Sequence, residues 1–178
     1  MVEIILTEGC VCDSLIIDGK EARDYSGKEL NAIIKQVLEE EKSKFNLIRL
    51  LGMVVEIFDD GSTDDCAVKT DKYGLIAITE QDQDGVDVIT VGERDANDFT
   101  VDEIRDMIIA VINSRGDNAD LIWTLRGLVQ NLGEYKFCYH CDECGDDVVE
   151  YKVNYPHLKE GASCLNIKEK NLKDIQSD

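Results

Sequence analysis

The feature that most constrains the fold of this chain is an internal repeat at an offset of 74 residues, as from Asp24 to Asp98. The segment DYSGKELNAIIKQVL, which begins at Asp24, aligns without a gap with DFTVDEIRDMIIAVI, which begins at Asp98. Apolar residues occupy the same positions in both segments. This agreement predicts one structural unit that occurs twice along the chain.

Each aligned segment begins with the residues of a helix capping box. Ser26 with Glu29, and Thr100 with Glu103, have the spacing at which a hydroxyl and a carboxylate satisfy free amides at a helix start. The apolar spacing that follows is that of a helix with one buried face. The buried face is predicted to comprise Leu30, Ile33, Ile34, Val37 and Leu38 in the first copy and Ile104, Met107, Ile108, Val111 and Ile112 in the second.

A second helix and two strands complete each copy at nearly the same offset. The second helices carry Leu47, Ile48, Leu51, Val54 and Val55, aligned with Leu121, Ile122, Leu125, Leu128 and Val129. Upstream, residues 4–8 and 14–18 in the first copy, and 76–80 and 88–92 in the second, have the apolar, β-branched composition of strands.

The sequence therefore predicts an α+β fold of two tandem ββαα units with a C-terminal cysteine-knuckle β-hairpin. The first unit spans residues 1–72 and the second spans 73–155, where a strand, a knuckle and a strand follow the last helix. The first copy retains only Cys66 of that cluster. Residues 156–178 begin with the only proline and are expected to form an appendage.

The chain is strongly acidic, with 38 acidic and 19 basic residues among 178 and a formal charge of −19. The negative electrostatic field of such a chain repels phosphate backbones and attracts basic protein surfaces, so direct nucleic-acid binding is not expected. The second unit is the most negative part of the chain, because residues 73–155 hold 18 acidic and 6 basic side chains. Acidic excess also simply aids solubility.

The location is expected to be cytoplasmic, because the amino terminus lacks the pattern of a signal peptide and no apolar run is long enough to span a membrane. The seven cysteines are then expected to be thiols or metal ligands instead of disulfides.

The cysteine cluster is the strongest chemical signal, because CxxC followed by glycine is the knuckle in which two thiolates bind one zinc ion. Cys141 and Cys144 form this pair. Two further ligands would come from Cys138, His140, His157 and Cys164, and the candidate zinc set is Cys138, Cys141, Cys144 and Cys164. The alternative is plain thiols packed at a hairpin.

Catalysis is not expected. A redox role for the CxxC pair is disfavoured, because the carboxylates around it raise the thiol pKa and a strand, not a helix, follows. The sequence also lacks the common nucleotide-binding, serine-hydrolase and metalloprotease motifs.

A resemblance adds a biological context to this interpretation. The segments CVCDSLIIDGKE from Cys10, GEYK from Gly133 and CDECGDDVVEY from Cys141 resemble the ends of small uncharacterised proteins encoded by phages and prophages of Gram-positive bacteria. Small, strongly acidic phage accessory proteins include inhibitors of host defence, anti-CRISPR proteins among them. The resemblance implies a protein that offers carboxylates to the basic channel of a nuclease.

The leading hypothesis is thus a phage-derived inhibitor that binds a nucleic-acid-handling enzyme of its host, most concretely a class II, Cas9-type nuclease. The alternative is a zinc-stabilised protein–protein adaptor without inhibitory activity. The acidic residues expected to bind the partner lie in the second unit: Asp95, Asp98, Asp102, Asp106, Asp142, Glu143, Asp146 and Asp147.

Overall fold

The computed structural model describes residues 2–9, 13–61, 63–81, 83 and 87–155, and it confirms the predicted α+β class. The helices are α1 (Gly27–Glu40), α2 (Lys44–Phe58), α3 (Val101–Ser114) and α4 (Asn118–Leu132), and the 3-10 turns are η1 (Ala22–Asp24) and η2 (Ala96–Asp98). The strands are β1 (Val2–Glu8), β2 (Ser14–Ile17), β3 (Lys20–Glu21), β4 (Cys66–Thr70), β5 (Gly74–Gln81), β6 (Asp87–Val91), β7 (Arg94–Asp95), β8 (Glu134–His140) and β9 (Asp147–Tyr155). The predicted appendage, residues 156–178, lies outside the described residues.

Both capping boxes form as predicted. The Ser26 hydroxyl accepts from the Glu29 amide at 3.3 Å, and the Glu29 carboxylate accepts from the Ser26 amide at 2.7 Å. Thr100 and Glu103 repeat this geometry with the same two distances. All ten apolar residues predicted for the inner faces of α1 and α3 are buried.

The strands form two antiparallel sheets of matching register. The first has the order β3-β2-β1-β9-β8, and the second has the order β4-β5-β6-β7. In the first sheet Ile4 lies between Ile17 and Val153. In the second sheet its counterpart Ile76 lies between Val91 and Val68, so β9 and β4 occupy equivalent places.

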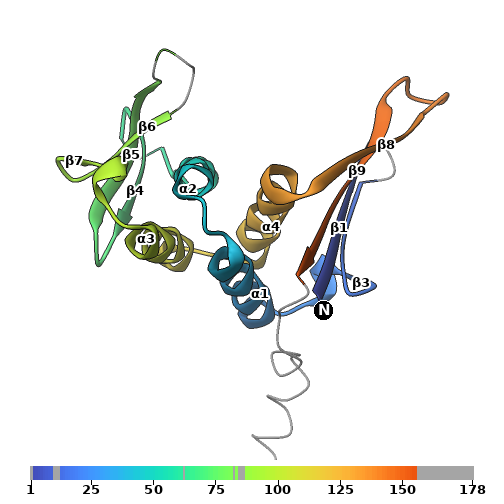
Figure 1. The fold of residues 1–178 in the computed structure, drawn as a ribbon, viewed down its shortest axis with the longest axis horizontal. Coiled ribbons are helices and arrows are strands. Elements are labelled where there is room, and N and C mark those ends of the chain that lie inside the picture. The colour runs from blue at the N-terminus through green and yellow to red at the C-terminus, as the bar shows by residue number, and fades with distance from the viewer. Residues whose placement is uncertain (1, 10–12, 62, 82, 84–86, 156–178) are drawn as a thin grey trace, which may run out of the picture.

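Each sheet therefore combines strands from both sequence repeats. We call residues 2–40 and 118–155 lobe 1, which holds the first sheet, α1 and α4, and residues 44–114 lobe 2, which holds the second sheet, α2 and α3. The division into residues 1–72 and 73–155 thus describes the sequence repeat and not the packing units, because the terminal strand of each copy pairs with the sheet of the other copy. The two sheets diverge from a central helix layer as the arms of a V (Figure 1).

The two lobes are related by an approximate twofold axis that passes between α2 and α4. Met53 and Gly127 occupy equivalent positions in the repeat, and a Cβ atom at Gly127 would overlap the Met53 sulfur and lie 3.0 Å from its Cε. A residue that contacts its own equivalent is the signature of a twofold interface. The pairs Asn31–Asn113 and Arg49–Asn131 link the lobes through side-chain hydrogen bonds of 3.2 and 3.1 Å.

One hydrophobic core extends through both lobes, since the buried residues of the four helices and both sheets form a single cluster. This continuity fixes the two arms relative to each other. No helix in the described ranges has the length and apolar character that crossing a bilayer requires.

Candidate functional site

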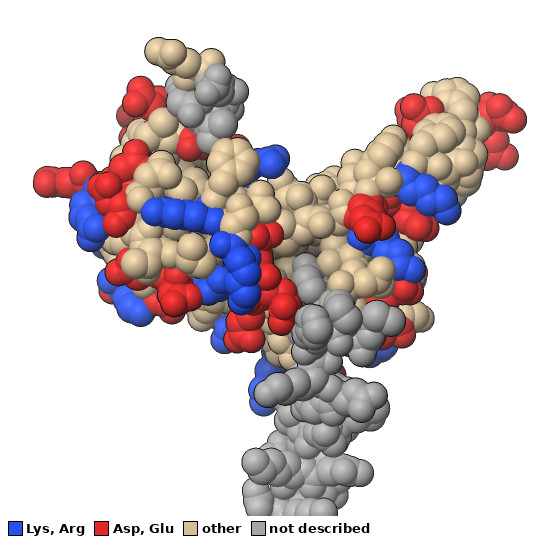
Figure 2. Space-filling model, viewed as in Figure 1, with Lys and Arg blue, Asp and Glu red and all other residues tan. Residues whose placement is uncertain are grey.

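The hairpin of β8 and β9 projects beyond the helix layer (Figure 1). Its tip carries acidic residues. The Cys141 amide donates to the Asp146 carbonyl at 2.8 Å, and the Gly145 amide donates to the Cys141 carbonyl at 2.9 Å. Gly145 has φ 79°, a conformation that glycine adopts without strain. This turn exposes the four predicted carboxylates Asp142, Glu143, Asp146 and Asp147, and acidic atoms gather at the end of the arm in Figure 2.

The predicted zinc ligands are only partly placed. Cys138 lies at the β-bulge of β8 and is exposed, and Cys141 and Cys144 lie at the two ends of the tip turn. The described residues contain no group of three His, Cys, Asp or Glu side chains arranged to hold a metal ion. Cys164 and His157 lie outside the described residues, so the zinc set stays a prediction.

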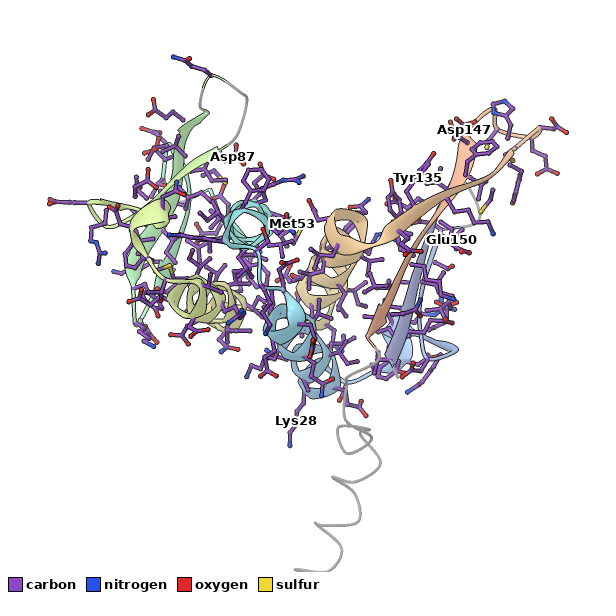
Figure 3. The ribbon with its side chains drawn as sticks, in the orientation of Figure 1. Lys28, Met53, Asp87, Tyr135, Asp147 and Glu150 are labelled. Carbon is purple, nitrogen blue, oxygen red and sulfur yellow. The ribbon has the colours of Figure 1, made fainter. Side chains whose placement is uncertain are left out.

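His140 is the other candidate ligand of the cluster, and its ring contacts a carboxylate. Its Nδ1 atom lies 2.8 Å from Asp147 Oδ1, and both side chains are exposed. An exposed pair of this kind contributes little to stability. Figure 3 labels Asp147 near the end of the β8–β9 arm, at the base of the tip turn.

The other four predicted acidic residues lie on lobe 2, on the opposite arm of the V. Asp95 caps η2 by accepting from the Asn97 amide at 2.7 Å, and Asp98 is exposed in the same turn. Asp102 is exposed on α3 and pairs with Arg105. The structure therefore does not bring the eight predicted carboxylates into one surface, and only those of the hairpin tip form a compact group.

Asp106 is a half-exposed residue of α3 whose contacts the sequence analysis does not predict. Its carboxylate pairs with Lys72 and accepts from the Tyr73 hydroxyl at 2.5 Å. The Lys72 and Tyr73 hydrogen bonds lower the pKa of Asp106 below its usual value. Both partners lie in the turn between β4 and β5. The spacing of residues along α3 gives no sign that this turn packs against the helix. Asp106 thus anchors α3 to the sheet of lobe 2.

Arg105 compensates the acidic end of α1, a contact that the sequence analysis misses. Its guanidinium donates to the carbonyls of Leu38 at 2.8 Å and Glu41 at 2.7 Å. A cation at this end of a helix is favourable because the free carbonyls carry partial negative charge. The run of glutamates that ends with Glu41 is therefore partly neutralised from α3 of the other lobe.

Exposed aromatic residues on the hairpin are a second feature that the sequence analysis misses. Tyr135 is 61% exposed, and its ring meets that of Tyr151 edge-on with centroids 5.5 Å apart. Because Tyr151 pairs with the buried Leu6, Tyr135 lies on the helix-covered face of the sheet and points into the V (Figure 3). Phe137 and Tyr139 are also exposed. The alternation in β8 of aromatic and other residues is the signal that could have revealed Tyr135 and Phe137 on one face. The bulge between Phe137 and Tyr139 shifts the register, so that Phe137 pairs with Val149 and Tyr139 pairs with Val148, which places Tyr139 on the other face.

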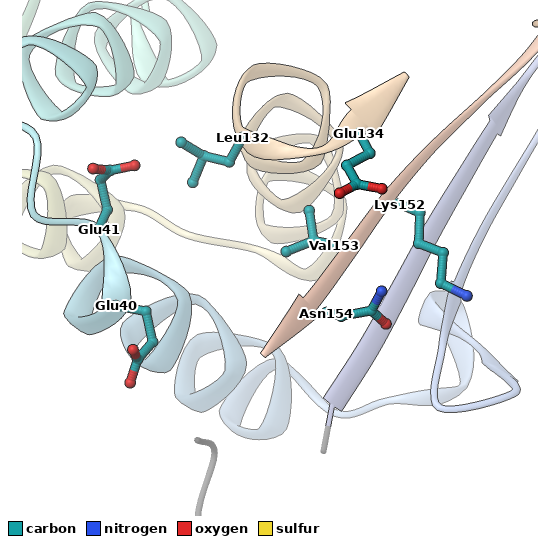
Figure 4. Close-up of a pocket in the computed structure, with 7 residues that line it drawn as sticks. All are labelled: Glu40, Glu41, Leu132, Glu134, Lys152, Val153 and Asn154. Carbon is teal, nitrogen blue, oxygen red and sulfur yellow. The ribbon is translucent and has the colours of Figure 1, made fainter. Parts of the chain in front are cut away.

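The base of lobe 1 contains a shallow polar cavity of about 260 Å³ between the ends of α1, α4 and β9 (Figure 4). Glu40, Glu41 and Glu134 contribute carboxylates to its lining. Lys152 extends away from them and pairs with Glu3 on β1. The Glu41 carboxylate accepts from the Ser43 amide at 2.6 Å and caps the link to α2. The hydrogen bond between Ser43 and Glu41 thus stabilises the link between α1 and α2.

The chain matches no family model, no curated protein and no solved structure.

Proposed function

We propose that this protein is a non-catalytic binding protein that inhibits a nucleic-acid-handling enzyme by docking onto its basic nucleic-acid channel. The observation that carries the proposal is the projecting hairpin, which exposes four carboxylates at its tip and three aromatic side chains along β8. Aromatic residues supply much of the binding energy in protein interfaces, and complementary charge speeds association. A Cas9-type nuclease is the most concrete partner, on the resemblance to phage proteins.

The perturbed titratable groups of the described residues are consistent with binding instead of catalysis. Glu103 has a lowered pKa because it accepts the hydrogen bonds of the Thr100 cap, and Arg126 has a raised pKa because it pairs with Asp13. Burial raises the pKa of the Cys66 thiol, which makes it a poorer nucleophile. In each case the shift accompanies a structural contact or burial.

Inhibition is tested by neutralising the tip. The variant Asp142→Asn, Glu143→Gln, Asp146→Asn removes three exposed carboxylates and leaves Asp147 with its histidine partner. The matched control Asp64→Asn, Asp65→Asn, Asp71→Asn makes the same charge change at exposed positions of lobe 2.

At roughly 0.5 kcal/mol for each neutralised contact, the tip variant should bind a Cas9-type nuclease about tenfold more weakly and protect DNA from cleavage less. The control should retain binding. Equal inhibition by both variants, or no binding of the nuclease by the parent protein, contradicts the proposal.

The second candidate function is a zinc-stabilised adaptor without inhibitory activity. The position of Cys141 and Cys144 at the ends of one tight turn favours it, since a zinc knuckle uses this spacing. An adaptor would retain its partner without changing nuclease activity, so a binding assay combined with a cleavage assay separates the two functions.

A further inference from the structure

An arginine of lobe 1 shows how this fold binds a guanidinium group. Arg126 on α4 donates to the two carboxylate oxygens of Asp13 at 2.9 and 2.8 Å and to Glu8 at 3.3 Å. Its side chain is only 14% exposed, and its Cζ atom lies 5.1 Å from the centroid of the Trp123 ring. The guanidinium is thus bound by two carboxylates and covers an aromatic face.

In lobe 2 an aspartate stands at the position of Asp13, and a glycine stands at the position of Arg126. At the repeat offset, Asp87 corresponds to Asp13 and Gly52 corresponds to Arg126. The positions also correspond in space, because a Cβ atom at Gly52 would lie 3.2 Å from Asp87 Oδ2. The carboxylate therefore faces the helix position from which an arginine extends in the other lobe.

A cavity of about 440 Å³ lies beside this position, lined by residues of α2 that flank Gly52 in sequence and by Asp87 at the start of β6. Glu56 and Asp87 line it with carboxylates, and Phe45 and Met53 line it with apolar surface. Figure 3 labels Met53 on the side of α2 that faces α4, and Asp87 at the start of β6. Phe45 is more than half exposed, and its ring already lies beneath the guanidinium of Arg49 on one side.

The charge around the cavity suits a cation. The pKa of the adjacent Cys66 thiol is raised first by burial and then by the nearby carboxylates of Asp59, Glu56 and Asp87. Arg49, which also lines the cavity, donates to Asn131 on α4 at 3.1 Å and packs over Phe45. Its guanidinium is therefore held toward α4, away from the β6 wall.

We propose that this cavity binds an arginine side chain of a protein partner, with Asp87 holding the guanidinium as Asp13 holds Arg126. A group of carboxylates alone would not indicate such a ligand, but the equivalent positions of lobe 1 bind a guanidinium in the same structure. Arginine fits better than lysine because its planar fork pairs with a carboxylate through two hydrogen bonds and stacks on an aromatic ring. The inference rests on the proposed function in one respect, namely that a protein partner supplies the arginine side chain.

The site is tested with N-acetyl-L-arginine amide, titrated into the ¹⁵N-labelled full chain at physiological salt. Amide shifts should concentrate at Gly52, Glu56 and Asp87, with smaller shifts for the lysine analogue. Asp87→Asn should weaken binding about tenfold, since it removes a charge-assisted bidentate contact. The matched control Asp142→Asn makes the same charge change at the hairpin tip and should leave the affinity unchanged.

A second variant places the ligand within the chain. Gly52→Arg supplies the guanidinium from the position of Arg126 and should abolish the titration of the cavity. Its Cβ atom needs small shifts of Asp87 and of Ile89, whose Cδ1 atom it approaches to 3.3 Å, so Asp87→Asn remains decisive if this variant does not fold.

Shifts spread evenly over exposed carboxylates, or equal affinity of Asp87→Asn and Asp142→Asn, would overturn the proposal. Because the titration uses no nuclease, its failure leaves the hairpin proposal standing. Conversely, a protein that binds no nuclease can still bind the arginine amide.

Discussion

The contact between Met53 and Gly127 at the twofold axis yields a quantitative prediction about how the lobes pack. Gly127 is buried in α4, and a methyl group there would overlap the Met53 sulfur and lie 3.0 Å from Cε and 3.3 Å from Cγ. Gly127→Ala therefore forces the methionine out of its present position. The same substitution favours the helix, because alanine is the better helix former.

The two effects have opposite signs and comparable size. Overpacking of this kind costs about 1–3 kcal/mol, whereas alanine in place of a helix glycine stabilises by about 1 kcal/mol. We expect Gly127→Ala to destabilise the parent protein by about 1 kcal/mol. In a Met53→Ala background the overlap is absent, so the same change should stabilise by about 1 kcal/mol.

Urea unfolding of the four proteins gives this coupling as a double-mutant cycle with an expected value of about 2 kcal/mol. Ala119→Gly is a suitable control, because Ala119 is an exposed residue of the same helix. It should have the same effect in both backgrounds. An equal effect of Gly127→Ala with and without Met53 would refute the packing of these two residues against each other.

Three further predictions concern single groups. Asp106→Asn should lower the free energy of unfolding at neutral pH by at most about 1 kcal/mol, since the carboxylate is 45% exposed. Because folding lowers the pKa of Asp106, the ionised carboxylate stabilises the folded protein above the unfolded pKa of about 3.9. This stabilisation is lost as the pH falls through the lower folded pKa, so the parent protein and Asp106→Asn should converge in acid denaturation. Arg105→Met should destabilise by about 1–3 kcal/mol in thermal unfolding, because it leaves the Glu41 carbonyl without its charged donor. If zinc is bound, elemental analysis should find about one ion per chain and a loss in Cys141→Ser; metal-free protein prepared without chelator contradicts it.

Local sequence patterns were sufficient for the regular elements of the repeat. Hydroxyl, carboxylate and apolar spacing predicted both capping boxes and the buried faces of α1 and α3, because these contacts join residues within two turns of one helix. The β8–β9 hairpin was also predicted, because its two strands are joined directly by the knuckle turn. β4 was missed, since its five residues follow an acidic loop and include only a short apolar run, Cys66–Val68.

The candidate sites were predicted less completely. The carboxylates of the hairpin tip were identified from the acidic character of the second unit and its knuckle, whereas the contacts of Asp106 were missed because its partners Lys72 and Tyr73 are distant in sequence. The cavity over Gly52 could not be inferred from composition. It is recognised only when Asp87 is compared in space with Asp13 and its bound arginine.

The sequence by itself determined that one unit occurs twice, which elements it contains and which faces they bury. Only the tertiary structure decided which copy each terminal strand joins, because β4 and β9 offer the same edge hydrogen bonds and the same apolar faces to either sheet. Three-residue links, residues 41–43 and 115–117, connect the paired helices. Short links of this kind favour exchange of elements between copies, and the exchange places Met53 against Gly127 and opens the cavity beside Asp87.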